Sequence, residues 1–295
     1  SLDEYVFFLY GGYSKFPWNT FAYYISNDSL LISPLSASGI SNDIYYMDMN
    51  NDGVDEITGI STSPENIHYP LPYTDSAAWL MVIDPVKMDF LFPPKRFDLG
   101  IGSWIKPVFY NINGSKYIAT SSFSNSASVG IDSVHLNIFN DRGKIINQKK
   151  LHGKDGYAIS FISSHQLNSN SFYLIDHMAN VYKTDTTLQL TRVHNKDVES
   201  IAFIDIHKNE IIDIDGDGKN EIIVIGTNQK GERILIIYRN NFKQALIIPI
   251  PEDKTYSAWH FSMINSMEGN SPILALQLDN YLYHINYSKS EYYFL

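Results

Sequence analysis

The stretch that decides the fold is Asp213-Ile214-Asp215-Gly216-Asp217-Gly218-Lys219-Asn220-Glu221, which continues directly into Ile222-Ile223-Val224-Ile225. Oxygen-bearing side chains stand at its relative positions one, three, five and nine, and a glycine follows the third of them. A second stretch, Asp48-Met49-Asn50-Asn51-Asp52-Gly53-Val54-Asp55-Glu56, repeats this spacing and also leads into isoleucine. The two copies predict two acidic turns, each followed by a β-strand.

Alternating oxygen ligands in a tight loop are typical of calcium sites, because Ca²⁺ is a hard cation that takes six to eight oxygens. The glycine permits the sharp turn, position seven needs only its backbone carbonyl, and the final glutamate closes the shell. The sequence therefore predicts two calcium ions. The predicted ligands are Asp48, Asn50, Asp52, Val54 and Glu56 in the first loop and Asp213, Asp215, Asp217, Lys219 and Glu221 in the second. The alternative is a pair of Asx-turn clusters that bind no metal.

The composition narrows the classes of function. The chain has 295 residues, 44% of them hydrophobic, and a net charge of −10. This charge disfavours nucleic acid and anionic lipid as partners. Cysteine is absent, which excludes disulfides, thiolate metal sites and cysteine nucleophiles. The sequence shows no signal peptide and no apolar run long enough to span a membrane.

Short runs of Ile, Val, Tyr and Phe alternate with Asn, Gly, Asp and Ser clusters, and helical periodicity is almost missing. The runs recur in groups of about 50 residues, which is typical of propeller blades. We therefore expect an all-β fold: one β-propeller domain over residues 1–295 with six or seven four-stranded antiparallel blades. The first blade shows only three strands, which suggests a domain excised from a longer chain. A β-sandwich or two small β-domains are the alternatives.

The two acidic loops resemble the FG-GAP and VCBS-type repeats of integrin α-subunit propellers and of many secreted bacterial proteins. In that family the acidic loop joins the first and second strands of a blade, as expected here. The resemblance implies a structural role for calcium and a bacterial protein that works outside the cytoplasm, either periplasmic, secreted or at the cell surface. The corresponding stretches at residues 111–116, 163–170 and 265–270 lack the carboxylates, so no ligands are expected there.

Ligand binding is expected on the face opposite the calcium loops, where the long connections 13–19, 62–77 and 124–132 gather. Aromatic side chains there suit sugar rings or a peptide. The candidate residues are Trp18, His68, Tyr69, Tyr73, Trp104 and Trp259. Packing between blades is the alternative role, particularly for Trp104 and Trp259.

These features favour a non-enzymatic binding or sensing module for a glycan, peptide or protein, such as the ectodomain of a receptor with a membrane anchor outside this chain. A secreted polysaccharide lyase or glycan hydrolase is the alternative, because some calcium-bearing propellers have that activity. Its acid–base candidates are Glu65, His68, Asp75, Lys106, Lys154, Asp155 and His260. A purely architectural role is the third reading.

Overall fold

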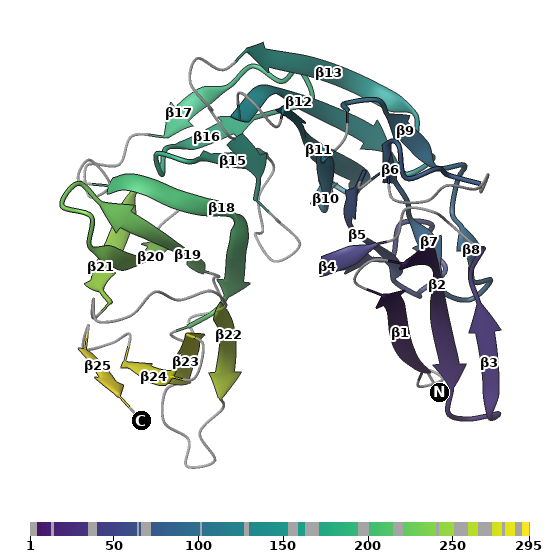
Figure 1. Cartoon of the computed structure of the whole chain (residues 1–295), viewed down its shortest axis with the longest axis horizontal. Helices are drawn as coiled ribbons and strands as arrows, with labels where there is room; N and C mark the ends of the chain where they lie inside the picture. The colour runs from purple at the N-terminus through teal and green to yellow at the C-terminus, as the bar shows by residue number, and fades with distance from the viewer. Residues whose placement is uncertain are drawn as a thin grey trace. The chain divides into compact units, whose positions relative to one another are not determined.

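The part of the chain that the structure describes is built from β-strands joined by turns in the computed structural model (Figure 1). The structure describes residues 5–12, 15–34, 40–63, 65, 72–100, 102–126, 130–152, 159–162, 171–193, 201–214, 221–239, 242–250, 259–264, 273–278, 281–286 and 291–294. Within these ranges every regular element is a strand, which confirms the all-β class. None of them contains a helix with the length and apolar character to cross a membrane.

The strands form antiparallel sheets that follow the chain order. The first sheet is β1 (Tyr5–Gly12), β2 (Lys15–Tyr24) and β3 (Ser29–Ile32). Three sheets have four strands each: β14 (Ile159–Phe161), β15 (Phe172–Asp176), β16 (Val181–Thr184) and β17 (Thr191–Val193); β18 (Ile201–Ile212), β19 (Glu221–Asn228), β20 (Arg233–Arg239) and β21 (Gln244–Pro249); β22 (Trp259–Ile264), β23 (Ile273–Leu278), β24 (Tyr281–Asn286) and β25 (Glu291–Phe294).

The region between residues 41 and 152 is joined into one longer sheet. Its strands are β4 (Ser41–Met47), β5 (Glu56–Thr62), β7 (Ile83–Asp84), β8 (Asp89–Phe90), β10 (Trp104–Ile112), β11 (Ser115–Ser126), β12 (Gly130–Asn140) and β13 (Ile145–His152). The join is short, since β5 pairs with β10 only at Thr62 with Trp104 and Ser61 with Ile105. Strands β6 (Ala78–Leu80) and β9 (Lys95–Phe97) pair separately.

Two compact units divide the chain. The first comprises Ser1–His165, Ser169–Tyr173 and Thr184–Gln189, and the second comprises Gln166–Asn168, Leu174–Lys183 and Leu190–Leu295. In the first unit, Met49, Leu80, Ile105, Phe109 and Phe139 belong to one buried apolar cluster. In the second unit, β19 and β20 are buried along nearly their whole length. An unbroken apolar run suits strands covered on both faces, as the Ile-rich sequence predicts.

Two expected long connections are strands instead. Residues 15–19 belong to β2, where Asn19 pairs with Tyr10, so the predicted loop 13–19 is wrong. Most of the predicted loop 124–132 is also strand, because β11 extends to Ser126 and β12 begins at Gly130. Both hairpins carry register shifts, and β-bulges of this kind let polar residues continue a ladder that the sequence pattern would end. The connection between β5 and β6 is non-strand in its described residues, as expected.

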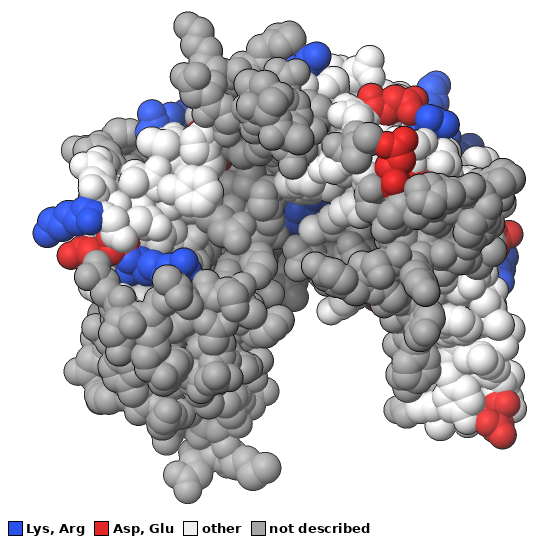
Figure 2. Space-filling model, viewed as in Figure 1, with Lys and Arg blue, Asp and Glu red and all other residues white. Residues whose placement is uncertain are grey.

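Acidic and basic side chains lie close together in small groups on the face drawn in Figure 2. Arg96 pairs with Asp98 at 2.6 Å between Nε and Oδ1, and both side chains are largely exposed. Such exposed pairs contribute little to stability. The described part of this face therefore shows mixed charges, although the whole chain is acidic.

Two hairpin turns use glycine in the same left-handed position. The N–H of Gly143 donates to the carbonyl oxygen of Asn140, and the N–H of Gly231 donates to that of Asn228, both at 3.0 Å. The φ angles are +67° at Gly143 and +87° at Gly231. Their surroundings differ, because a Cβ at Gly143 would lie 2.4 Å from the Phe92 ring, whereas one at Gly231 would meet nothing within 4 Å.

We predict that Gly231→Ala costs about 1 kcal/mol of folding free energy, the cost of a left-handed non-glycine residue. Gly143→Ala should cost clearly more, because the added methyl also overlaps Phe92. Urea denaturation of both variants measures the difference. Equal losses would contradict the packing described at Phe92.

Candidate metal centre

The first acidic loop is a hairpin connection held by its own polar side chains. Asp48 accepts hydrogen bonds from the N–H of Asn51 at 2.6 Å and of Gly53 at 3.1 Å. Further along, the N–H of Asp52 donates to Asn50 Oδ1 at 2.8 Å. The φ angles of Asn51 and Gly53 are +66° and +88°, the left-handed region that Asn and Gly tolerate best. The residue types of the motif therefore build the turn directly.

The glutamate that ends this loop is fully buried. Glu56 is the first residue of β5, and its Oε2 accepts a hydrogen bond from the N–H of Met49 at 2.6 Å. Its Oε1 accepts one from the side-chain amide of Asn50, also at 2.6 Å. The carboxylate is thus turned back into the loop rather than outward.

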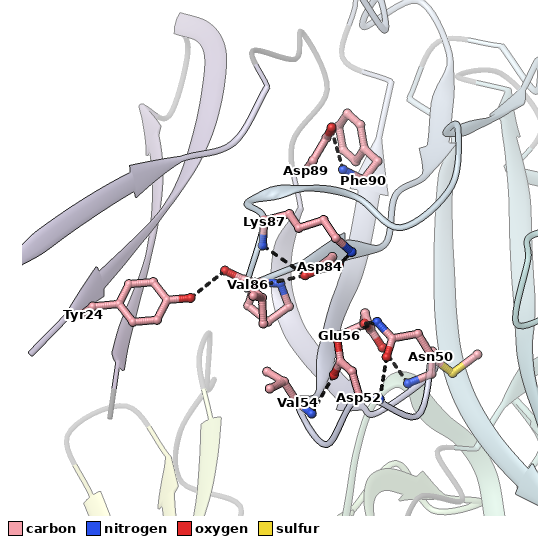
Figure 3. A network of polar contacts seen from close by, with 12 residues as sticks. Tyr24, Asn50, Asp52, Val54, Glu56, Asp84, Val86, Lys87, Asp89 and Phe90 are labelled. Atoms are coloured by element: carbon pink, nitrogen blue, oxygen red, sulfur yellow. Dashed lines mark hydrogen bonds and ion pairs between the residues drawn. The ribbon is translucent and has the colours of Figure 1, made fainter. Parts of the chain in front are cut away.

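Asp84 lies next to the loop but belongs to the hairpin of β7 and β8, so it is not part of the nine-residue motif. Ile83 of β7 pairs with Ile57 of β5, so Asp84 lies opposite Glu56. One carboxylate oxygen each from Asp52, Glu56 and Asp84 lie within 4.8 Å of one another (Figure 3). Asp84 is buried as well. The register of β5 and β7 is the signal that identifies it, and a local sequence motif does not contain that information.

The triad of Asp52, Glu56 and Asp84 fits one hard cation. Oxygens that bind one Ca²⁺ at about 2.3–2.6 Å lie at most about 5 Å apart. The triad's separations fall within this limit. The three carboxylates offer oxygen ligands, which suit Ca²⁺, Mg²⁺ or Mn²⁺ and not the softer metals. The predicted ligand Asn50 instead faces them with its side-chain N–H, which donates to Asp52 at 2.9 Å and to Glu56 at 2.6 Å. The three carboxylates could therefore hold a metal ion.

Two lysines contact the acidic groups. Lys87 Nζ lies 2.5 Å from Asp84 Oδ2, while the N–H groups of Val86 and Lys87 donate to Asp84 Oδ1 (Figure 3). The Lys87 side chain is 69% exposed, so it can leave the carboxylate at little cost. Lys116 donates to the carbonyl oxygen of Asp48 and lies 3.4 Å from its Oδ1.

The surroundings of Glu56 and Asp48 shift the pKa values of these two groups in opposite directions. Burial raises the pKa of Glu56 from 4.5 to about 7; the hydrogen bond from Met49 opposes this shift, and the nearby carboxylate of Asp52 adds to it. Burial also raises the pKa of Asp48, but hydrogen bonds from Asn51 and Gly53 and the charge of Lys116 outweigh it, so the net shift is downward. Glu56 is therefore the group that most needs a cation.

The second acidic loop repeats the frame of the first. Met47 pairs with Glu56 across β4 and β5, and Ile212 pairs with Glu221 across β18 and β19. Glu221 is buried, and its Oε2 accepts a hydrogen bond from the N–H of Ile214 at 3.0 Å, as Glu56 does from Met49. The remaining predicted ligands, Asp215, Asp217 and Lys219, lie outside the described residues.

The aromatic candidates for ligand binding belong to different packing clusters where they are described. Tyr73 packs edge-on against Trp79 and Phe90, with ring centroids 5.3 and 5.2 Å away. Trp104 stacks on Phe123 at 4.2 Å. The structure gives Trp18 and Trp259 strand backbones in β2 and β22, so Trp18 is not in a loop, and His68 and Tyr69 lie outside the described residues. A shared platform therefore remains a prediction.

Two of the acid–base candidates that the structure describes are buried, and a third is exposed. Asp75 and Lys106 are each 1% exposed, and Lys106 Nζ lies 5.9 Å from the centre of the Tyr45 ring. Glu65 is exposed, and its N–H donates to the carbonyl oxygen of Asp75 at 3.1 Å. His260 lies in β22, whereas His68, Lys154 and Asp155 lie outside the described residues.

We predict that metal-stripped protein loses stability as the pH rises through 7. The folded-state pKa of Glu56 lies above its unfolded value, so its contribution is fully present below about pH 4.5 and is lost as the pH rises through about 7. Glu56→Gln removes this dependence. Urea denaturation in calcium-free buffer gives the free energy of unfolding of the wild type and of the variant. The pH dependence is the change, between pH 5 and pH 8, in the difference between these two free energies. A constant difference would contradict the raised pKa.

The sequence matches no known family and no curated protein. Two solved structures are similar along the chain. A protein assigned as a 6-phosphogluconolactonase from Bacteroides fragilis has 13% identity and a TM-score of 0.48, over 100% of this chain and 81% of that one. An oligogalacturonate lyase in complex with manganese has 10% identity and a TM-score of 0.40, over 97% of this chain and 73% of that one. At these values the similarity assigns no function to this chain.

Proposed function

We propose that the loop of residues 48–56 and Asp84 together bind a structural Ca²⁺ ion. The observation that carries this proposal is the buried pair of carboxylates at the start of a strand, Glu56 opposite Asp84, with Asp52 completing the triad. Burying charge is costly unless a counter-charge compensates it, and a divalent cation bound by all three carboxylates supplies that compensation. The oxygen ligands suit a hard cation, and their alternating spacing along one loop favours calcium among these.

The ion would act on folding rather than on a reaction. Its ligands connect β4, β5 and β7, so binding ties together three strands of one sheet. Free energy of binding to the folded state then adds to the free energy of unfolding. Calcium sites of extracellular modules work at about 10⁻⁴–10⁻³ M, a concentration typical of the outside of cells. This favours a location outside the cytoplasm.

On this frame we propose an extracytoplasmic binding or sensing module, a calcium-stabilised β-propeller of the FG-GAP/VCBS type. Support comes from the chain-ordered four-stranded antiparallel sheets and from the two acidic loops, each joining the first and second strands of its sheet. The partner would be a glycan, a peptide or a protein, and the sensing role would include a membrane anchor outside this chain.

We predict that Ca²⁺ raises the melting temperature of metal-stripped protein by several degrees, about 2–4 °C per kcal/mol of binding free energy. Asp84→Asn should reduce this rise strongly. The amide oxygen can still accept the hydrogen bonds from Val86 and Lys87, so the loss reports the missing charge and ligand rather than the turn.

Asp89→Asn is the matched control for this experiment. Asp89 is exposed, lies in the same hairpin and pairs with Asp84 in the ladder. The Asp89→Asn variant should leave the calcium-induced rise in melting temperature unchanged, as scanning calorimetry with and without Ca²⁺ would show. A wild type whose midpoint ignores both Ca²⁺ and chelator would refute the structural ion.

Binding and turnover distinguish the module from an enzyme. We expect the calcium-loaded protein to retain glycans or peptides on an array without degrading them. A parallel screen on polyuronides and neutral glycans, followed by reducing-end and unsaturated-product assays, measures degradation directly. Turnover that Lys106→Met or Asp75→Asn abolishes would instead establish the lyase or hydrolase reading.

A further inference from the structure

The two acidic hairpins have the same frame but differ at one decisive position. In both, the residue before the loop pairs with the buried glutamate, and the residue after the first aspartate donates its N–H to that glutamate. On the next strand, Ile57 pairs with Ile83 in the first hairpin and Ile222 pairs with Tyr238 in the second. One residue further along, the equivalent positions hold Asp84 and Arg239.

Arg239 is held where its charge can reach Glu221. Directly opposite residues of antiparallel strands have Cβ atoms about 4.5–5.5 Å apart, well within the reach of an arginine side chain. The preceding Tyr238 is buried, and its hydroxyl donates to the carbonyl oxygen of Ala179 at 2.9 Å, which fixes this end of β20. Arg239 itself is half-buried, and its Nε atom is shielded from solvent.

The first hairpin also contains a cation, but of a different kind. Lys87 reaches Asp84 from a mostly exposed side chain, so a metal ion can displace it. The guanidinium of Arg239 starts from a shielded Nε and stays charged at any pH at which the protein is folded, which makes it a permanent counter-charge. Calcium affinity depends on the number of charged ligands, and the exchange of aspartate for arginine changes the local charge by two.

We infer that Arg239 supplies in the second hairpin the positive charge that calcium supplies in the first, so that the second loop binds calcium much more weakly. This inference rests on the proposed structural ion at the first loop. It divides the two loops of the motif into a metal-dependent hairpin at Glu56 and a metal-independent one at Glu221.

Calcium titration of the metal-stripped full chain by isothermal calorimetry tests the inference. We expect one strong site and a second that is at least about tenfold weaker, the effect of about one ligand charge. Asp84→Asn should weaken the strong site and so identify it. Arg239→Gln should strengthen the weak site about tenfold, whereas Arg239→Lys, which keeps the charge, should leave it weak.

Stability in calcium-free buffer at pH 8 gives an independent readout that does not depend on Arg239 variants folding. Glu56→Gln should raise the urea midpoint, because it removes a buried charge beside other carboxylates. Glu221→Gln should lower it, because it removes the negative charge opposite Arg239 while the amide oxygen still accepts from Ile214.

Two equally strong sites in the wild type, an unchanged weak site in folded Arg239→Gln, or a stabilising Glu221→Gln would each overturn the inference and leave the structural ion intact. A wild type that binds no calcium at all would refute the proposed function instead. The two failures are therefore distinguishable.

Discussion

A buried carboxylate at the first residue of a strand must be compensated by hydrogen bonds, by a cation or by protonation. Glu56 meets this requirement with a backbone N–H and a side-chain amide, yet its pKa still rises to about 7. The hydrogen bonds orient the carboxylate toward the loop without fully stabilising its charge. The proposed ion would supply the charge compensation that these hydrogen bonds leave incomplete.

The register of the sheet determines which charged side chain lies opposite each buried glutamate. Asp84 adds negative charge opposite Glu56, and together with Asp52 these residues could hold a metal ion. Arg239 stands at the equivalent position beside Glu221 and adds positive charge. The same loop motif thus has an acidic neighbour on the next strand in one hairpin and a basic neighbour in the other.

The aromatic residues show how packing limits inference from composition. Tyr73 packs edge-on against Trp79, and Trp104 stacks on Phe123, so each of these predicted ligand residues also has a packing contact of its own. Aromatic rings fit both sugar-binding surfaces and sheet interiors, since the same apolar face serves either purpose. Trp18 illustrates the related problem of boundaries, because β2 begins at Lys15, within residues that the pattern assigns to a loop.

The sequence by itself determined the all-β class, the chain-ordered strands and the acidic turn of residues 48–56, because these depend on local periodicity and on side chains that bond to their own backbone. Both strands begin at the final glutamate of the motif, one residue before the isoleucine that was expected to start them. Only the tertiary structure decided that Asp84 faces Glu56 whereas Arg239 occupies the corresponding place beside Glu221. Cross-strand neighbours are set by register, which arises from pairing between distant segments and leaves no local signal in the chain.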